Sequence, residues 1–190
     1  MTAEGLEVLI RSNEWLTHVL TTVRAARLSD AWVGAGALRD LVWGECFGSG
    51  FVPGDVRDVD VAFFDPLDPS RDSDRRATAL LHKLDPQVPW EATKQAAVHT
   101  WYPAEFGGPE VPPLSSIAEA IGTWPETATA VAVRLAAERI EVCAPFGLDD
   151  LLNGVWRHNP ARVSPEQSAA RLARHRPGHR WPGVTVIPPG

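Results

Sequence analysis

Acidic side chains in short alternating segments are the residues of this sequence best suited to chemistry. Asp58 and Asp60 lie in residues 58–64, where apolar side chains fill the positions between and after them. Residues i and i+2 of a strand share one face and lie about 6.5–7 Å apart. Two carboxylates at this spacing can reach one divalent cation or bridge two cations about 3.5–4 Å apart. An exposed polar face is the alternative, although Asp is disfavoured in strands and two on one face repel each other.

A third acid follows the same pattern much later in the chain. Glu141 stands between Ile140 and Val142, whose side chains would point to the opposite face of a strand. Three carboxylates from adjacent strands would form a hard oxygen site that prefers Mg²⁺ or Mn²⁺ over zinc. Alternatively, Glu141 is a solvated strand residue that pairs with Arg139.

A glycine-containing turn precedes these acids. Residues 31–33 form a short apolar run, and Gly34 and Gly36 then lead into a helix expected over residues 37–47. Glycines let a backbone approach phosphate, and the free N–H groups at the start of a helix attract anions. Arg39 lies in the first turn of that helix and could clamp a phosphate with two hydrogen bonds. A purely structural turn remains an alternative, and the match to a dinucleotide-binding fingerprint is weak because the third glycine is missing.

The order of these motifs resembles the DNA polymerase β-type nucleotidyltransferase superfamily. The turn at residues 33–40 is similar to the Gly-Gly-x-x-Arg-Asp element of the tRNA CCA-adding branch, and Asp58-Val59-Asp60 and Glu141 follow in the same order. The chain resembles more closely a bacterial family of nucleotidyltransferase proteins of this length. That resemblance lies in residues 32–42, 57–65, 95–99 and 124–160, which together span most of residues 31–160.

The resemblance implies an α+β nucleotidyltransferase fold, with a mixed central β-sheet flanked by helices. It implies that Gly34, Gly36, Ala37 and Arg39 hold the triphosphate of a nucleoside triphosphate. Asp58, Asp60 and Glu141 would be the catalytic residues and would bind Mg²⁺ or Mn²⁺. The reaction would move a nucleoside monophosphate to an acceptor that the sequence does not identify. The turn differs from that of the superfamily because it carries an extra Ala35 and no Ser.

The remaining segments must place these residues. Periodic apolar residues predict one or two helices over residues 6–27, with Asn13 as a possible cap. We expect a loop at 48–54, a break at 65–70, a helix at 73–84, a β-like segment at 90–102, a loop at 106–113 and a short helix at 117–121. Alternation predicts a hairpin of strands 127–135 and 139–144, then helices at 148–156 and 165–174. An irregular tail is expected from residue 177 onward.

Length and composition limit the class of protein. The 190 residues predict one domain: a nucleotidyltransferase domain at 1–160, with residues 161–190 as its C-terminal helix and irregular tail. Eighteen Lys and Arg residues against 24 Asp and Glu residues give a net charge of −6, which argues against long nucleic acid as a partner. All of these cations except Lys83 and Lys94 are Arg, which suits a small phosphorylated ligand.

Neither a signal peptide nor a membrane-spanning run is expected from the sequence, and the two cysteines, Cys46 and Cys143, are expected to be reduced. These features predict a cytoplasmic protein without a membrane partner and leave its oligomeric state open. Four tryptophans could include one that stacks on a base, although core packing is expected for each: Trp90, Trp101, Trp124 and Trp156. A non-catalytic nucleotide-binding or protein-interaction module on the same fold is the second hypothesis, and an NAD-type binding protein is the third.

Overall fold

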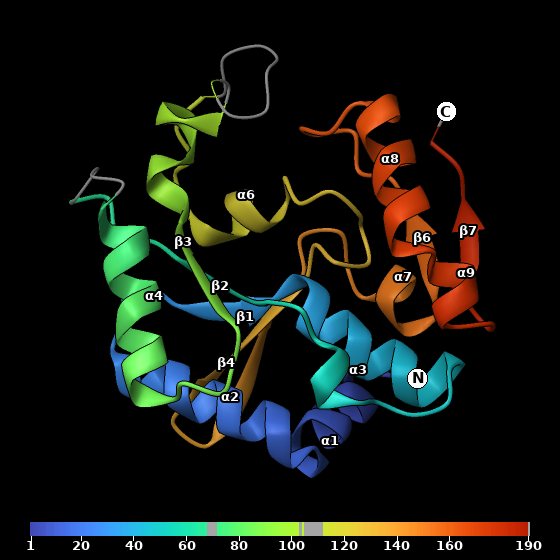
Figure 1. Cartoon of the computed structure of the whole chain (residues 1–190), viewed down its shortest axis with the longest axis horizontal. Helices are drawn as coiled ribbons and strands as arrows, with labels where there is room; N and C mark the ends of the chain where they lie inside the picture. The colour runs from blue at the N-terminus through green and yellow to red at the C-terminus, as the bar shows by residue number, and fades with distance from the viewer. Residues whose placement is uncertain (68–71, 103, 105–111, 190) are drawn as a thin grey trace.

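A five-stranded mixed sheet forms the centre of the protein in a computed structural model (Figure 1) that describes residues 1–67, 72–102, 104 and 112–189. The strands are β1 (Trp32–Gly34), β2 (Val59–Phe63), β3 (Trp90–Lys94), β4 (Ala132–Ala136) and β5 (Arg139–Cys143). Their order is β3-β2-β1-β4-β5. Only the β2–β3 pair is parallel, while β1 pairs antiparallel with both β2 and β4, and β4 with β5. The mixed sheet flanked by helices agrees with the predicted fold class.

One face of the sheet is covered by helices from the first half of the chain. These are α1 (Ala3–Ser12), α2 (Glu14–Ala26) and α4 (Asp72–Leu84), and α3 (Ala35–Phe47) packs beside them. Asn13 separates the first two helices, and its side chain accepts a hydrogen bond from the Leu16 N–H at 2.9 Å. The predicted cap is therefore confirmed. Val33, Val61 and Val133 face these helices and are fully or almost fully buried.

The connection from β1 to α3 is tighter than the sequence suggested. The helix begins at Ala35, two residues before the predicted start, and Ala35 itself has a positive φ of 50°. This left-handed conformation costs an L-residue roughly 1–2 kcal/mol. It turns the chain from the sheet into α3 without an intervening loop. After α3, residues 48–58 contain only a short 3₁₀ helix, η1 (Pro53–Asp55).

The other face of the sheet is covered in part by α6 (Ile117–Ile121) and the segment that follows it. The predicted strand over 127–135 is wrong in its first half, since β4 begins at Ala132. The N–H groups of Thr129 and Ala130 bond instead to the Glu126 carbonyl, which closes a turn. Glu126 is completely buried and fixes this turn where the alternating pattern predicted extended chain.

The edge strand β3 is shorter than the predicted β-like segment. It ends at Lys94 and passes directly into a 3₁₀ helix, η2 (Gln95–Thr100). Helix α4 protects the outer edge: Thr78 accepts the Ala92 N–H at 3.0 Å, and Asp74 accepts the Lys94 N–H at 2.8 Å. Capping the free N–H groups of an edge strand prevents them from pairing with another chain. Residues 106–111 of the loop predicted at 106–113, and residues 68–70 of the break predicted at 65–70, lie outside the described residues.

The C-terminal region is ordered, which corrects the prediction of an irregular tail. It contains α7 (Asp149–Leu152), β6 (Val155–Arg157), α8 (Pro165–His175), α9 (Pro177–Arg180) and β7 (Thr185–Ile187). Strand β6 replaces the second half of the helix predicted at 148–156, because it pairs in parallel with β7. Trp43 of α3 joins this region to the domain by packing against Trp156 and Trp181 at ring distances of 6.3 and 5.2 Å.

Within the described residues, no helix combines the length and the apolar character needed to cross a bilayer.

Candidate active site

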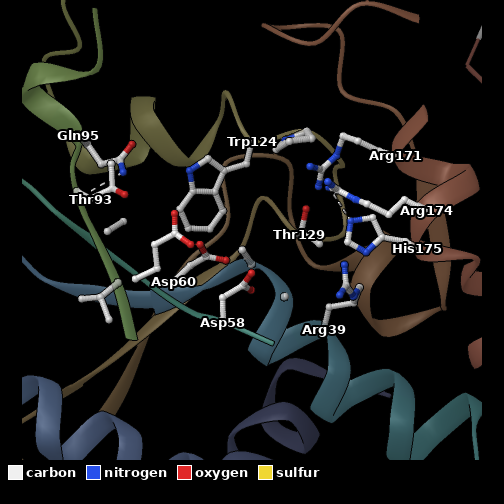
Figure 2. A pocket seen from close by; sticks show the side chains of 16 residues that line it. Arg39, Asp58, Asp60, Thr93, Gln95, Trp124, Thr129, Arg171, Arg174 and His175 are labelled. Carbon is white, nitrogen blue, oxygen red and sulfur yellow. Dashed lines mark hydrogen bonds between the residues drawn. The ribbon is translucent and has the colours of Figure 1, made fainter. Parts of the chain in front are cut away.

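Three carboxylates from neighbouring strands line one cavity of about 310 Å³. Asp58 immediately precedes β2, and Asp60 lies within it. In the parallel β2–β3 pair, Asp60 is the register partner of Glu91. Adjacent strands lie about 4.8 Å apart, so the side chains of such a pair are neighbours on one face. The predicted Asp58 and Asp60 are thus brought to a single cavity, and the acid that accompanies them is Glu91 (Figure 2).

The electrostatic state of these acids shows an excess of negative charge. The pKa of Asp60 is raised to about 7 by burial and by repulsion from Asp58 and Glu91. The Gly36 N–H, which donates a hydrogen bond to this carboxylate, and the nearby Arg39 oppose the increase. Burial and Asp58 also raise the pKa of Glu91. A cation among these carboxylates would offset the repulsive part of both increases, and the part that burial causes, which is the largest single one, would remain.

Glu141 does not join this group, and the expectation that it would complete a metal site with the aspartates is wrong. It lies on the outer strand β5, three strands away from β2, which corresponds to about 14 Å across the sheet. Its carboxylate accepts a 2.7 Å hydrogen bond from Arg134, which also binds Asp30 at 2.6 Å. The predicted alternative of an ion-paired strand residue is therefore right in kind, with Arg134 as the partner in place of Arg139.

The β1–α3 turn contributes less to the cavity than its sequence suggested. Ala35, Gly36 and Arg39 line the cavity, whereas Gly34 and Ala37 are not part of its lining. Two amides of the turn already have acceptors, because the Ala35 N–H donates to the Val131 carbonyl at 3.3 Å and the Gly36 N–H donates to Asp60. Gly34 is required for packing: a Cβ atom there would lie 2.7 Å from both Trp124 and the Val131 carbonyl.

Arg39 is held at the base of the cavity by its neighbours. Its guanidinium donates to Asp40 at 2.9 and 2.6 Å and lies over the rings of Trp156 and Trp181. Asp40 also accepts a hydrogen bond from Arg180 at 3.1 Å. These contacts fix the position of Arg39, and Asp40 offsets part of its positive charge. Arg39 still borders the cavity that contains Asp60.

The wall opposite the acids is basic, and it comes from a part of the chain to which the sequence analysis assigned no function. Arg171, Arg174 and His175 project from α8 toward the cavity (Figure 2). Their spacing of i, i+3 and i+4 places them on one face of a helix, which was the available signal. The histidines of the chain show no metal-ligand spacing, so the sequence predicted no role for His175.

His175 is uncharged within this basic wall. Burial, together with repulsion from four arginines, lowers its pKa to about 3; the arginines are Arg39, Arg171, Arg174 and Arg180. The Arg174 guanidinium donates to its Nε2 atom at 3.3 Å. The wall thus presents the charges of several arginines around a neutral imidazole, an arrangement that attracts a polyanion.

Helix α8 is fixed against the cavity by a buried ion pair. Arg171 donates to both carboxylate oxygens of Glu126, at 2.7 and 3.1 Å. Glu126 is fully buried and also accepts a 3.1 Å hydrogen bond from the Thr129 hydroxyl. Thr129 lines the cavity together with Trp124, so the same contacts that hold α8 also shape the upper side of the cavity.

The carboxylates of the cavity fit a hard divalent cation whose remaining ligands would come from water and a phosphorylated ligand. Within the ranges that the structure describes, no cluster of three His, Cys, Asp or Glu side chains is arranged as a ready metal site. Mg²⁺ commonly uses only one or two carboxylates and takes its other ligands from water and substrate phosphates. Asp58 and Asp60 can supply such a pair, since both line the cavity from neighbouring positions of one segment.

Comparisons with known proteins agree with this architecture. A family model described as Nucleotidyltransferase matches residues 21–186. A solved structure whose title reads "The NMR structure of the protein reveals a CCA-adding enzyme head domain" is 27% identical, with a TM-score of 0.79, and the match covers 98% of this chain and 96% of that one.

A "tRNA-processing enzyme (apo form I)" shares the fold at 16% identity, with a TM-score of 0.51, over 98% of this chain and 45% of its own. No curated protein sequence matches significantly. The family match spans the turn, all three cavity acids and the basic wall, and the resemblance seen in the sequence is confirmed. The chain belongs to the Nucleotidyltransferase family.

Proposed function

We propose that this protein transfers a nucleoside monophosphate from a nucleoside triphosphate to an acceptor, with release of pyrophosphate. The observation that carries the proposal is the division of one cavity into two charged walls. Asp58, Asp60 and Glu91 form the acidic wall, and arginines of α3 and α8 form the basic wall. A triphosphate that bridges the two walls would place its reacting phosphorus near the acids and its terminal phosphates near the arginines.

Asp58 and Asp60 would hold Mg²⁺ or Mn²⁺. When bound, the ion would neutralise the phosphate oxygens and polarise the phosphorus toward attack. The residues of the chain then act by position and charge. Arg174 is the exposed cation of the basic wall and can bind the departing pyrophosphate, while Arg39 and Arg171 are held by Asp40 and Glu126 and keep the local potential positive.

The attacking and leaving oxygens of phosphoryl transfer lie roughly in line. Because pyrophosphate would leave toward α8, the acceptor must approach from the side of β3. Glu91 stands on that side, and its raised pKa makes it a better proton acceptor near neutral pH than an ordinary glutamate. We assign to Glu91 the role of receiving the acceptor's proton.

Calorimetry with the non-hydrolysable α,β-methylene-ATP tests the proposal. The intact protein should bind this nucleotide in Mg²⁺ and much more weakly in EDTA, and the double variant Asp58→Ala/Asp60→Ala should lose the difference. Arg174→Gln should weaken binding, while Arg139→Gln, an exposed change on β5, should not. Failure of the intact protein to bind any common nucleoside triphosphate in Mg²⁺ would remove the basis of the proposal.

A non-catalytic nucleotide sensor is the second candidate, and a specific observation favours it. Two amides of the turn and the guanidinium of Arg39 already have partners within the protein. A site built for binding without turnover could tolerate this engagement. Pyrophosphate release from radiolabelled ATP, measured with a panel of small hydroxylated and amino compounds as acceptors, separates the two. Release that depends on Asp60 supports catalysis, and tight binding without release supports a sensor.

A further inference from the structure

An indole ring forms the upper side of the cavity, and the chemistry proposed above makes no use of it. We propose that Trp124 and Gln95 form the nucleobase subsite, with Trp124 stacking on the base and the Gln95 amide bonding to its edge. The inference rests on the proposed function and adds to it the residues that distinguish a nucleoside triphosphate from bare polyphosphate.

The sheet register places the Trp124 ring beside the catalytic acids. Trp32 pairs with Ala62 and Val33 pairs with Val61, so the next position along β1, Gly34, lies level with Asp60. Paired Cα atoms of antiparallel strands are about 4.5–5.5 Å apart. The benzo edge of Trp124 packs directly on Gly34, where an added Cβ would lie 2.7 Å from Cζ3. The indole therefore stands next to Asp60.

The backbone that carries the ring is held in place by hydrogen bonds, and the ring packs on Gly34. The buried Asn159 side-chain amide donates to the Gly122 carbonyl at 2.8 Å and to the Trp124 carbonyl at 2.7 Å. The Asn159 N–H donates to the Pro125 carbonyl at 2.9 Å. An aromatic surface fixed before binding loses little conformational entropy when a ligand stacks on it. This clamp makes Trp124 a prepared platform.

Part of the indole is open to the cavity. Trp124 is only half-buried and lines the cavity wall. Two buried tryptophans bond their indole N–H to backbone carbonyls, as Trp43 does to Leu151 and Trp90 does to Asp85. Across the described residues, the Trp124 indole N–H has no such acceptor, and it is not buried. Its polar edge is therefore available to a ligand.

Gln95 supplies the directional group. It is buried, lines the same cavity and donates from Nε2 to the Thr93 carbonyl at 3.2 Å. This bond fixes the amide and leaves its carbonyl oxygen and second N–H free to pair with a base edge. Figure 2 shows Gln95 and Thr93 on the side of the cavity away from Arg171 and Arg174. A base bound there would be separated from the terminal phosphates that the arginines hold.

Calorimetry in Mg²⁺ with two probes tests the subsite: α,β-methylene-ATP, which has a base, and inorganic tripolyphosphate, which has none. The wild type should bind the nucleotide more tightly. Trp124→Leu should weaken nucleotide binding roughly 5- to 150-fold, as expected for the loss of one base stack. Tripolyphosphate binding should change less than twofold, which also shows that the variant is folded.

Further variants sharpen the result. Trp124→Phe should restore most of the nucleotide affinity that Trp124→Leu loses. Gln95→Ala should reduce the differences in affinity among nucleotides that carry the four different bases. Trp15→Leu is the matched control, since Trp15 packs against Phe51, outside the residues that line the cavity. Equal losses for both probes, no loss for either, or a wild type that binds both probes equally would overturn the subsite. A wild type that binds neither probe would refute the proposed function itself.

Discussion

Replacement of Asp60 by Asn should stabilise the protein in a manner that depends strongly on pH. The pKa of Asp60 is about 7 in the folded protein and 3.8 when unperturbed. A folded pKa above the unfolded value means that the folded state binds the extra proton, so wild-type stability falls as pH rises from about 4 to about 7. The pKa difference of about 3 corresponds to about 4 kcal/mol above pH 7. Asn carries no charge and avoids this loss.

Because water and neighbouring groups relax around a buried charge, we expect Asp60→Asn to gain about 2–4 kcal/mol at pH 8 and almost nothing at pH 4. The Gly36 N–H can still donate to the Asn carbonyl, so its hydrogen bond is kept. Urea unfolding followed by tryptophan fluorescence from pH 4 to 8.5 in EDTA measures the difference, since urea does not screen charges. Glu138→Gln is the control, because Glu138 is exposed.

The same unfolding assay can be repeated in the presence of Mg²⁺. Wild-type protein should gain stability on addition of Mg²⁺ at pH 8, and the Asn variant should gain less because one ligand is weakened. A stability difference that does not vary with pH would show that Asp60 is not held under repulsion. A variant less stable than the wild type at pH 8 would refute the reasoning more directly, since the charged carboxylate would then stabilise the fold.

Two further predictions concern packing around the cavity. Gly34→Ala should destabilise the protein by about 1–3 kcal/mol, since its Cβ would meet Trp124 and a backbone carbonyl at 2.7 Å. Gly36→Ala, with neighbours at 3.6 and 3.8 Å, should be neutral or slightly stabilising. Thermal unfolding compares the two variants, and equal Tm values would contradict the close approach at Gly34. Glu126→Gln should cost about 2–4 kcal/mol because Arg171 keeps its charge without a partner, and adding Arg171→Met should recover part of that loss in urea unfolding. A double variant as unstable as the sum of the single ones would argue against coupling.

Local patterns in the sequence predicted the elements whose causes are local. Asn13 capped the expected helix, and Asp58 and Asp60 reached one cavity because period-2 spacing fixes a face. The same periodicity applies to Glu91 and Glu141, which both stand between strand residues. Periodicity identifies the face that a side chain occupies but not the strand order, and that order places Glu91 beside Asp60 and Glu141 three strands away. Sheet order depends on contacts far apart in the chain.

The basic wall could not be located for a related reason. The spacing of Arg171, Arg174 and His175 shows that they share a helix face. What that face meets is decided by the Glu126–Arg171 pair and by the Trp43 packing, both of which are long-range. Residues 127–131 were wrongly predicted as a strand from their alternating pattern. Hydrogen bonds to the Glu126 carbonyl form a turn there instead.

The position of α8 near the end of the sequence has a consequence for how the protein is made. All five strands of the central sheet precede residue 144, so a nascent chain can complete the sheet before residues 165–175 have been synthesised. During that interval the acids would stand on an open surface with no arginine wall facing them. In the proposed function, binding of a triphosphate would therefore have to wait until α8 docks. Under that proposal, the order of synthesis would keep an incomplete chain from binding nucleotides.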